Sequence, residues 1–218
     1  DTLLIARDRY GIKPLHIYQD EDVLLFSSEL KSLMKWGFEK EIDYNSLYQY
    51  FQFNYIPQQS SIFKKCRKLQ VGCLLEIKKG VCSEGKWYNL PFDNKNYTNL
   101  SYDAQQKELV NLMRSSVEDR LVADVPLGTF LSGGIDSSII TALAAESVKD
   151  LNTFSIGYKD ESFFDETHYA DLVAKRYKTN HTVFKLSNDD LYEHLFSALD
   201  YIDEPFADSS ALAVNILC

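Results

Sequence analysis

Short apolar segments separated by turns fill the first part of the chain, up to about residue 90. Strands are predicted over 2–7, 15–19, 23–28, 73–78 and 81–88. Turn residues at 10–11, 19–22 and 79–80 separate them, and a helix is expected over 29–35. Consecutive short strands with close turns favour an antiparallel sheet in this part of the chain.

After residue 100 the pattern changes to alternating helices and strands. Ser101 is placed to cap a helix whose apolar residues recur at steps of three and four: Leu109, Leu112, Met113, Val117 and Leu121. Strands are expected over 126–131, 152–158 and 181–186, and helices over 137–145, 165–177, 189–201 and the apolar run 211–218. This alternation is typical of a doubly wound parallel sheet. The Asn-rich segment 91–100 is the expected linker between the two parts.

Composition and charge narrow the classes of protein that this pattern allows. The 218 residues are 45% hydrophobic and 25% charged, which excludes a disordered or fibrous chain. A net charge of −9 argues against a protein that binds nucleic acid through its phosphate backbone. The four cysteines form no C-x-x-C pair and are expected to be reduced thiols, as in a cytoplasmic protein. No apolar run is long enough for a membrane span, so no membrane partner is expected.

Both ends of the sequence are expected to lie inside a longer chain. Strand-like residues begin at Asp1 with no Met, turn or cap before them. The apolar run at the other end stops at Cys218 without the Gly, Asn or basic residues that usually end a helix. A complete protein with frayed ends is the alternative.

One segment, between the strand 126–131 and the following helix, carries the candidate chemistry. It has the sequence Phe130-Leu-Ser-Gly-Gly-Ile-Asp-Ser-Ser138 and lies where open α/β sheets bind ligands. Gly133 and Gly134 allow a tight turn that points backbone N–H groups into one concavity. Hydroxyl donors are added beside a helix N-terminus by Ser132, Ser137 and Ser138. The segment predicts a site for an oxyanion such as pyrophosphate, although it lacks the Lys of a Walker loop and the third Gly of a dinucleotide fingerprint.

Asp136 is the acidic residue inside this segment. A carboxylate would repel bound phosphate unless a divalent cation lay between them, so Asp136 is expected to bind Mg²⁺ together with phosphate oxygens. The alternative is that Asp136 helps to cap the helix, which is an ordinary role for Asp near a helix N-terminus.

The run Ser132-Gly-Gly-Ile-Asp-Ser-Ser138 resembles the PP-loop of ATP pyrophosphatases, which split ATP into AMP and pyrophosphate. Its surroundings make the resemblance specific, because 120–128, 153–157, 164–168 and 203–211 are similar to segments of glutamine-hydrolysing asparagine synthetases. The first part agrees independently: 6–15 and 26–31 resemble the later strands of the glutaminase domain of that family. The resemblance is collinear and covers nearly the whole chain.

The resemblance implies a mixed fold, α/β plus α+β. Residues 1–90 would be the carboxy-terminal part of an antiparallel amino-terminal-nucleophile (glutaminase) domain, 91–100 a linker, and 101–218 the start of a doubly wound parallel-sheet PP-loop synthetase domain. It implies a carbon–nitrogen ligase that converts aspartate to asparagine through an acyl-adenylate. Its small-molecule partners would be aspartate, glutamine and ATP, with Mg²⁺ as cofactor, and a homodimer is compatible with it.

The family's site residues carry over to matching positions of this chain. The resemblance assigns ATP binding to Phe130, Leu131, Ser132, Gly133, Gly134, Asp136, Ser137, Ser138 and Ile156, and metal binding to Asp136. For Phe130 and Ile156 the alternative is a plain core position, because both would suit any buried strand.

The glutaminase half departs from the family at its nucleophile. The family uses an amino-terminal Cys whose α-amine is the base, whereas residue 1 is Asp. The family's second phosphate motif, of the type Ser-Gly-x-Gly-x-Asp-Glu, would follow Cys218. The fragment alone is therefore expected neither to hydrolyse glutamine nor to complete amide synthesis. Two alternatives stay open: a related amidotransferase for another carboxyl or sugar acceptor, and a nucleotide-binding module without catalysis.

Two charged groups outside this segment invite a functional interpretation. Arg7, Asp8 and Arg9 could form a site, but a structural ion-pair network is favoured, and a place at the domain interface is a further alternative. The carboxylates Asp203, Glu204 and Asp208 could bind metal or a substrate amine, or could cap and solvate a helix end, and no role is assigned to them.

Histidines and aromatic residues raise two further possibilities. A zinc site at His168 and His181 is disfavoured because the two lie on different predicted elements. An aromatic run could stack on bases, but without basic residues between its members it is expected to lie in the core or at a domain contact: Tyr44, Tyr48, Tyr50, Phe51, Phe53 and Tyr55.

Overall fold

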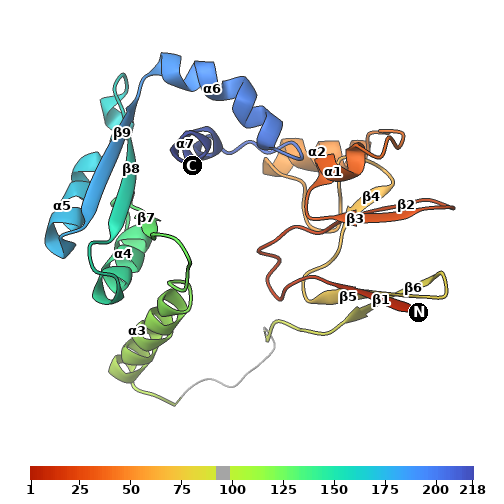
Figure 1. Cartoon of the computed structure of the whole chain (residues 1–218), viewed down its shortest axis with the longest axis horizontal. Coiled ribbons are helices and arrows are strands. Elements are labelled where there is room, and N and C mark those ends of the chain that lie inside the picture. Colours follow the sequence, from red (N-terminus) through yellow and green to blue (C-terminus); the bar gives the residue numbers. More distant parts are fainter. Residues whose placement is uncertain (92–98) are drawn as a thin grey trace. The chain divides into compact units, whose positions relative to one another are not determined.

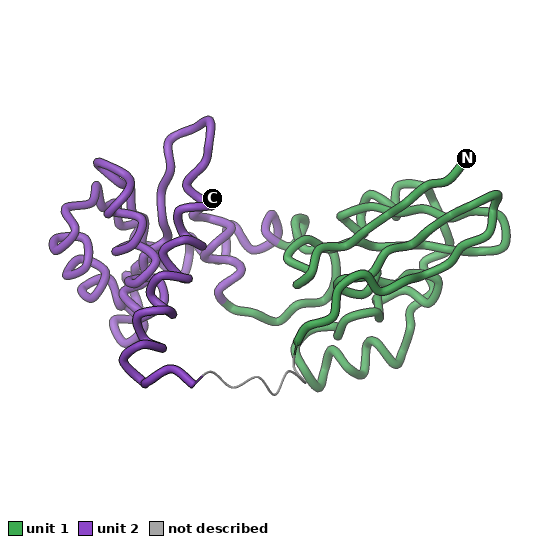
Figure 2. Tube along the Cα trace, turned by 90° about the horizontal axis from the view of Figure 1, so that it is seen from below, with its two compact units in different colours: residues 1–95, 199–209 green, residues 96–198, 210–218 purple. Residues whose placement is uncertain are grey.

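The computed structural model describes residues 1–91 and 99–218, and the chain divides into two compact units (Figure 2). Unit 1 comprises Asp1–Lys95 together with Leu199–Ser209, and unit 2 comprises Asn96–Ala198 together with Ser210–Cys218. Residues 92–98 of the expected linker lie outside the described residues, so the proposed domain boundaries stay a prediction.

Unit 1 is built from two antiparallel sheets of three strands each, with the orders β1-β5-β6 and β3-β2-β4 (Figure 1). Its strands are β1 (Thr2–Ala6), β2 (His16–Gln19), β3 (Leu24–Ser27), β4 (Cys66–Lys68), β5 (Cys73–Lys78) and β6 (Val81–Lys86), and its helices are α1 (Leu30–Met34) and α2 (Tyr44–Phe53). The five predicted strands and the first helix are confirmed, whereas β4 and α2 were not predicted.

Alternation along β2 places two apolar clusters on opposite faces of one sheet. Ile17 packs with Ile5 and Leu75 of the other sheet, whereas its neighbour Tyr18 packs with Leu30 of α1. Because successive side chains of a strand point to opposite faces, the sheet β3-β2-β4 lies between α1 and the sheet β1-β5-β6. Unit 1 is therefore layered helix, sheet, sheet, and apolar burial between the layers stabilises it.

Helix α2 carries most of the aromatic run. It begins after Asp43, whose carboxylate accepts a hydrogen bond from the Asn45 N–H, and it ends at Asn54 in the left-handed conformation. The expectation of a core position was wrong for five of the six residues, which are between 48% and 74% exposed: Tyr44, Tyr48, Phe51, Phe53 and Tyr55. Tyr50 alone among the six packs against the core. Aromatic residues on every side of a helix cannot all reach the core, since one stripe faces it.

Unit 2 contains a parallel sheet in the order β7-β8-β9. Its elements are α3 (Tyr102–Glu118), β7 (Gly128–Phe130), α4 (Ile135–Ser147), β8 (Asn152–Tyr158), the 3-10 helix η1 (Ser162–Phe164), α5 (Thr167–Tyr177), β9 (Asn180–Leu186), most of α6 (Asn188–Tyr201) and α7 (Ser210–Leu217). Ser101 caps α3 as predicted, because its Oγ accepts a hydrogen bond from the Ala104 N–H at 3.3 Å.

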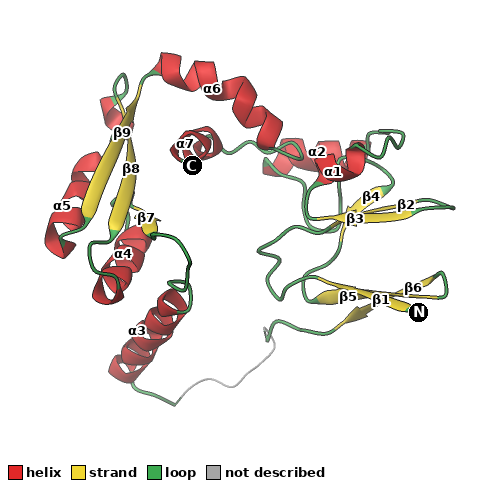
Figure 3. Ribbon diagram, viewed as in Figure 1, coloured by secondary structure: helices red, strands yellow, loops and turns green. Residues whose placement is uncertain are grey.

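Three helices of unit 2 contact its sheet. Helix α4 contacts β7, α5 contacts β8 and β9, and α7 contacts β8, while α4 and α5 also contact each other (Figure 3). Strand order follows chain order in the described part of unit 2, so the doubly wound arrangement stays a prediction. Among the described helices, none combines the length and apolar character needed to cross a membrane.

The four cysteines are free thiols, as expected. Cys66 is buried under α1, where burial and the nearby charge of Glu204 raise the pKa of its thiol to about 12. A thiol with so high a pKa stays protonated at neutral pH and is a poor nucleophile. Cys66 is therefore a core residue.

Candidate functional site

The predicted phosphate loop lies between β7 and α4, at the carboxyl end of a parallel strand. Gly133 has a φ of +87°, and a Cβ at this position would lie 2.5 Å from the Cβ of Tyr169 and 2.6 Å from the N of Ala170. Glycine alone meets both constraints. Gly134, the residue before α4, has a φ of −66°. The turn therefore depends on the first glycine of the predicted pair and not on the second.

Serine hydroxyls gather at the start of α4. The Oγ atoms of Ser132 and Ser137 lie 3.0 Å apart, and the Gly134 N–H donates to Ser132 Oγ at 3.3 Å. Ser138 follows in the first turn, where its N–H donates to the Gly134 carbonyl at 3.0 Å. Because the residue before α4 is a glycine, it offers no side-chain cap, and the first N–H groups of the helix are left for a ligand or water. The arrangement suits an anion.

Asp136 lies in the first turn of α4 and is exposed. Its carboxylate accepts no hydrogen bond from any residue of the described chain, so the capping alternative finds no support in its contacts. No cluster of three or more His, Cys, Asp or Glu that could hold a metal occurs in residues 1–91 and 99–218. A single free carboxylate suits Mg²⁺ that takes its other ligands from phosphate and water.

A cavity of about 350 Å³ adjoins the loop, which is within the range of small-molecule sites. Four of the residues predicted to bind ATP line it: Phe130, Leu131, Ser132 and Ile156. Phe130 is 53% exposed, so the core interpretation was wrong for this residue. The other predicted residues belong to the adjoining loop and the start of α4. The structure therefore brings the candidate residues together at one end of the sheet.

The start of the loop is fixed by buried hydrogen bonds to the neighbouring strand. The Leu131 N–H donates to the Phe154 carbonyl at 2.8 Å, and the Ser155 hydroxyl donates to the Leu131 carbonyl. His181 Nε2 lies 3.4 Å from Ser155 Oγ, and His181 Nδ1 lies 2.9 Å from Thr153 Oγ1. His181 therefore belongs to a polar network with Thr153 and Ser155, and Ser155 connects this network to the Leu131 carbonyl at the start of the loop.

A second apolar cavity of about 360 Å³ lies at the opposite, amino-terminal end of the strands. It is lined by α3, α4, Gly128 and Leu151, and among its lining residues Arg120 is the charged one. Ligands of open α/β sheets bind outside the carboxyl ends of the strands. The cavity beside the phosphate loop is therefore the candidate site.

Sequence reasoning missed the wall of the cavity that α7 provides. Ser210, Ala213, Val214 and Leu217 all line it, at the helical spacing of one face. It also missed Phe164 and Glu166, which line the same cavity. Residues 164–168 and Ser210 lie in segments noted for their family resemblance without a role. The rest of α7 was expected only as an apolar helix, a pattern that cannot distinguish a cavity wall from core.

Asp165 is held by the start of α5. Its carboxylate accepts hydrogen bonds from the Thr167 hydroxyl at 2.6 Å and the Thr167 N–H at 3.0 Å. These bonds lower the pKa of Asp165, the hydroxyl contact most strongly. Asp165 is therefore ionised at neutral pH, and it fixes the segment that carries Glu166 to the cavity rim.

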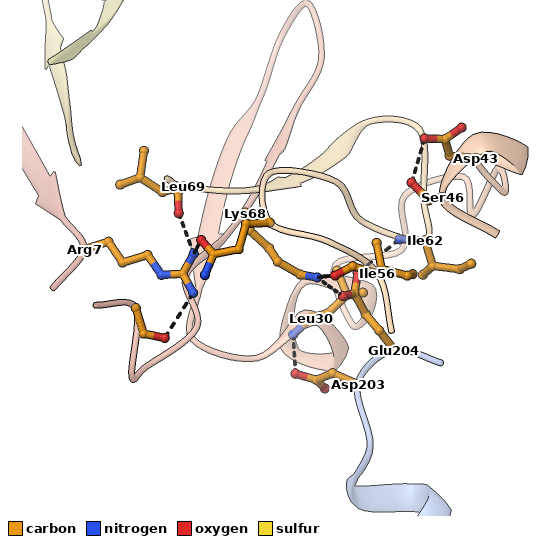
Figure 4. Close-up of polar contacts among 12 residues, drawn as sticks. Arg7, Leu30, Asp43, Ser46, Ile56, Ile62, Lys68, Leu69, Asp203 and Glu204 are labelled. Carbon is orange, nitrogen blue, oxygen red and sulfur yellow. Dashed lines mark hydrogen bonds and ion pairs between the residues drawn. The ribbon is translucent and has the colours of Figure 1, made fainter. Parts of the chain in front are cut away.

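Asp203 and Glu204 lie in unit 1, not at the cavity (Figure 4). Asp203 accepts hydrogen bonds from the N–H groups of Leu30 at 2.8 Å and Lys31 at 3.3 Å, and so it caps α1. Glu204 accepts a hydrogen bond from the Ile62 N–H at 3.0 Å and forms an ion pair with Lys68. Of the alternatives left open for this acidic group, capping is thus the one observed for Asp203.

Arg7 and Asp8 organise one turn of unit 1. Arg7 is buried and donates to the carbonyl of Leu69 at 2.6 Å and to that of Lys13 at 3.1 Å. The carboxylate of Asp8 accepts hydrogen bonds from the N–H groups of Tyr10, Ile12 and Lys13. The expected ion-pair network was wrong: among the described residues Arg7 and Asp8 have structural contacts, chiefly with backbone groups, but neither they nor Arg9 form an ion pair.

Comparisons with known proteins divide the chain close to the boundary between the two units. Residues 108–218 match the family described as asparagine synthase, and residues 1–88 match the family described as glutamine amidotransferase domain. The chain is 33% identical over 207 residues to asparagine synthetase (glutamine-hydrolyzing) 1 of Bacillus subtilis (strain 168), which covers 95% of this chain and 32% of the relative.

Two further relatives cover the chain to the same extent. Asparagine synthetase (glutamine-hydrolyzing) 3 of the same organism is 29% identical over 223 residues, with 94% of this chain and 36% of the relative covered. Amidase chyE of Penicillium rubens is 26% identical over 230 residues, with 96% of this chain and 33% of the relative covered. The chain therefore spans about a third of the length of these relatives.

Proposed function

Because the chain belongs to the asparagine synthase family, we propose that it is part of an enzyme that makes asparagine from aspartate, ATP and glutamine. The observation that supports this most strongly is the loop around Gly133, which has a left-handed backbone conformation. The loop leads into the serine-rich start of α4 and adjoins a cavity of about 350 Å³. Phosphates would lie on the loop and the helix N-terminus, and the nucleoside would lie in the cavity.

The proposed reaction has two steps. An oxygen of the aspartate side-chain carboxylate attacks the α-phosphorus of ATP, and the bond from that phosphorus to the pyrophosphate oxygen breaks. Ammonia then attacks the acyl carbon of the resulting acyl-adenylate, the bond to AMP breaks, and the nitrogen releases a proton. The Ser132, Ser137 and Ser138 hydroxyls and the first N–H groups of α4 would hold the pyrophosphate, whose negative charge grows as it leaves.

The adenine would contact the backbone around Phe130 and Leu131 and the neighbouring Ile156, which line the cavity. Asp136 is the residue that would hold Mg²⁺, because its carboxylate is exposed and unbonded in the first turn of α4. When bound, Mg²⁺ would neutralise phosphate charge during adenylation. The ion would need phosphate oxygens and water to complete its shell, since one carboxylate supplies one or two ligands.

Unit 1 is proposed to belong to the part of the whole protein that releases ammonia from glutamine, on the basis of its match to the glutamine amidotransferase domain. A second candidate function is the same adenylation chemistry on a different carboxyl acceptor. The similarity to amidase chyE favours this alternative, because that relative matches over the same region under another name. The cavity residues of this chain would serve either acceptor.

Nucleotide binding tests the role of the loop directly. The double variant Ser132→Ala, Ser137→Ala should raise the dissociation constant of Mg·ATP at least about tenfold, because hydrogen bonds to charged groups contribute about 1.5–3 kcal/mol each. Ser147→Ala is the matched control, since Ser147 is exposed at the other end of α4. Equal affinity of all three proteins in calorimetric titration would contradict the assignment.

The acceptor is tested with the whole protein. Release of pyrophosphate should depend on aspartate and should not occur with other carboxylates or with no acceptor. Release with a different carboxylate, and not with aspartate, would favour the second candidate while leaving the phosphate loop assigned.

A further inference from the structure

Polar side chains are buried against one face of the parallel sheet of unit 2. Thr153 is fully buried and Ser155 is 3% exposed, and as alternate residues of β8 they point to the same face. His181 is the register partner of Thr153 on β9, and its ring contacts both hydroxyls. Strands of a buried parallel sheet usually carry apolar residues, and a buried hydroxyl costs free energy unless it has a hydrogen-bond partner. The contacts of these two hydroxyls are therefore expected to account for their presence.

The hydrogen bonds of this network have one consistent direction, which follows from its contact with the loop. The Leu131 carbonyl can only accept, so the single hydroxyl hydrogen of Ser155 is committed to it. Ser155 Oγ can then only accept from His181, which places a hydrogen on Nε2, 3.4 Å away. The other nitrogen of a neutral imidazole is an acceptor, so Nδ1 accepts from the Thr153 hydroxyl at 2.9 Å. Thr153 Oγ1 in turn accepts from the Thr179 hydroxyl at 2.8 Å. The network therefore fixes one tautomer of the neutral His181 ring, with its hydrogen on Nε2.

The Leu131 carbonyl lies where the regular pairing of β7 ends. This strand pairs with β8 as far as Phe130, and the Leu131 N–H still donates to the Phe154 carbonyl at 2.8 Å. Beyond that point the Leu131 carbonyl takes its donor from a side chain, the Ser155 hydroxyl. Leu131 is 1% exposed, so water has little access to replace that donor. The orientation of the peptide between Leu131 and Ser132 therefore depends on one hydroxyl.

This peptide carries the first N–H group of the phosphate loop, that of Ser132. In a trans peptide the C=O and the N–H point in opposite directions, so the Ser132 N–H points away from Ser155 while the Leu131 carbonyl is bonded to it. No residue of the described chain accepts a hydrogen bond from the Ser132 N–H, which leaves this donor to a ligand. If the peptide flipped, a carbonyl oxygen would replace the N–H and would repel a phosphate. Holding the carbonyl therefore protects an anion-binding donor.

We propose that Ser155 and His181 are positioning residues of the nucleotide site. The Ser155 hydroxyl holds the peptide between Leu131 and Ser132 so that the Ser132 N–H faces the phosphates, and His181 Nε2 holds that hydroxyl. The proposal rests on the proposed function insofar as the ligand is ATP. Every residue in it belongs to unit 2. Because Ser155 is almost fully buried, it acts through the Leu131 carbonyl and not by contact with the nucleotide.

The first test compares Ser155→Ala with Thr141→Val in the full chain. Each substitution removes one buried hydroxyl, and that of Thr141 lies 2.9 Å from Thr129 Oγ1 and has no contact with the loop. In Ser155→Ala we expect the dissociation constant of Mg·ATP to rise at least about fivefold. Exchange of the Leu131 amide hydrogen should accelerate at least about tenfold relative to the amides of α5. Thr141→Val should lower the urea midpoint of unit 2 about as much and should change neither of these quantities.

Two variants of His181 test the role of its Nε2 hydrogen. The amide nitrogen of Gln reaches about as far as Nε2, whereas that of Asn reaches only as far as Nδ1. His181→Gln should therefore keep the dissociation constant of Mg·ATP within about twofold of the parent, and His181→Asn should raise it at least about threefold. Nitrogen-15 NMR of the parent chain should show the neutral His181 ring with its hydrogen on Nε2, and the spectrum of His181→Gln identifies the resonances. A merely structural histidine would require neither this tautomer nor this difference between Gln and Asn.

Unchanged exchange of the Leu131 amide in a folded Ser155 variant, or a neutral His181 ring with its hydrogen on Nδ1, would overturn the positioning proposal. Ser155→Cys keeps nearly the same size with a weaker donor, and it takes the place of Ser155→Ala if that variant fails to fold. Exchange and NMR need no nucleotide, so they are decisive even if the parent chain fails to bind ATP. Failure of the parent chain to bind ATP would instead contradict the proposed function. The two failures are therefore distinguishable.

Discussion

The buried polar residues of unit 1 and the polar residues of the loop in unit 2 differ in their partners. In unit 1, Arg7, Lys68 and Glu204 are buried or nearly so, and each has two or more hydrogen-bond or ion-pair partners from the chain itself. In unit 2, the polar residues of the loop are exposed or half-buried, and Asp136 has no partner in the described chain. Polar groups that are buried and satisfied specify a fold, whereas donors left open beside a left-handed glycine are available to a ligand.

The largest effect should come from Arg7→Met in unit 1. The substitution leaves the buried Leu69 carbonyl without its donor, so we expect the free energy of unfolding of unit 1 to fall by about 3 kcal/mol. Denaturant titration followed by the emission of Trp36 and Trp87 measures it, and the exposed Arg9→Met is the control. The affinity of the folded variant for ATP should not change. If Arg7→Met lowered the affinity for ATP without lowering the free energy of unfolding, the assignment of Arg7 to the fold and not to a ligand would be wrong.

Gly133→Ala should have the largest effect in unit 2. The positive φ and the contact with Tyr169 are both incompatible with a Cβ, so we expect a cost of about 1–3 kcal/mol and loss of measurable ATP binding. Gly134→Ala is the matched control, because its φ is negative and its nearest contact would be Ser132 Oγ at 3.4 Å. Circular dichroism and calorimetric titration report the two quantities. Equal behaviour of both variants would show that the loop does not depend on Gly133.

Asp136→Asn should change nucleotide affinity and leave the fold unchanged. With Mg²⁺ present, the dissociation constant of ATP should rise about tenfold, which corresponds to about 1.4 kcal/mol. With a chelator present the difference should vanish or reverse, because the carboxylate then repels phosphate. Asp189→Asn, in the first turn of α6, is the control for a carboxylate at a helix N-terminus. A loss of affinity that does not depend on Mg²⁺ would argue against metal binding by Asp136.

The smallest effect concerns the pH dependence of unit 1. His16 is 3% exposed, and burial lowers its pKa below the ordinary value of 6.5, with Glu204 and Asp203 opposing this shift and Lys68 and Arg7 adding to it. Below pH 6.5 the unfolded chain binds a proton that the folded unit resists, so stability should be constant above that pH and should fall as the pH drops below it. The slope cannot exceed about 1.4 kcal/mol per pH unit for one proton. His16→Gln should remove this contribution, which urea titrations at several pH values measure. A pH dependence of stability that is unchanged in the variant would show that groups other than His16 cause it.

Much of the fold was predictable because local pattern and structure agree. Ser101 caps α3, and the alternation after residue 100 gives the parallel strands with their helices. Helix α2 was not predicted, although Asp43 and Asn54 mark its two ends, because aromatic residues on every side hide the helical period. The loop 131–134 was found from its glycines and serines, but which glycine bears the positive φ requires the backbone.

The contacts of Asp203 and Glu204 were not predictable, because they join residues far apart in the chain. The Asp203 contact with Leu30 spans 173 residues, and the Glu204 contact with Ile62 spans 142. Local sequence shows three acidic residues around a proline, which fits a metal site, a substrate site or a cap equally well. Pairing over such distances depends on the tertiary structure and not on propensity.

The return of Leu199–Ser209 to unit 1 has a consequence for synthesis on the ribosome. Chains emerge from their amino-terminal end and domains tend to fold as they appear. Unit 1 emerges first, yet the partners of its buried Lys68 and of the Ile62 N–H arrive more than a hundred residues later. Through that interval Lys68 and the Ile62 N–H lack these partners, so the last contacts of unit 1 form only after the chain has been made as far as Glu204.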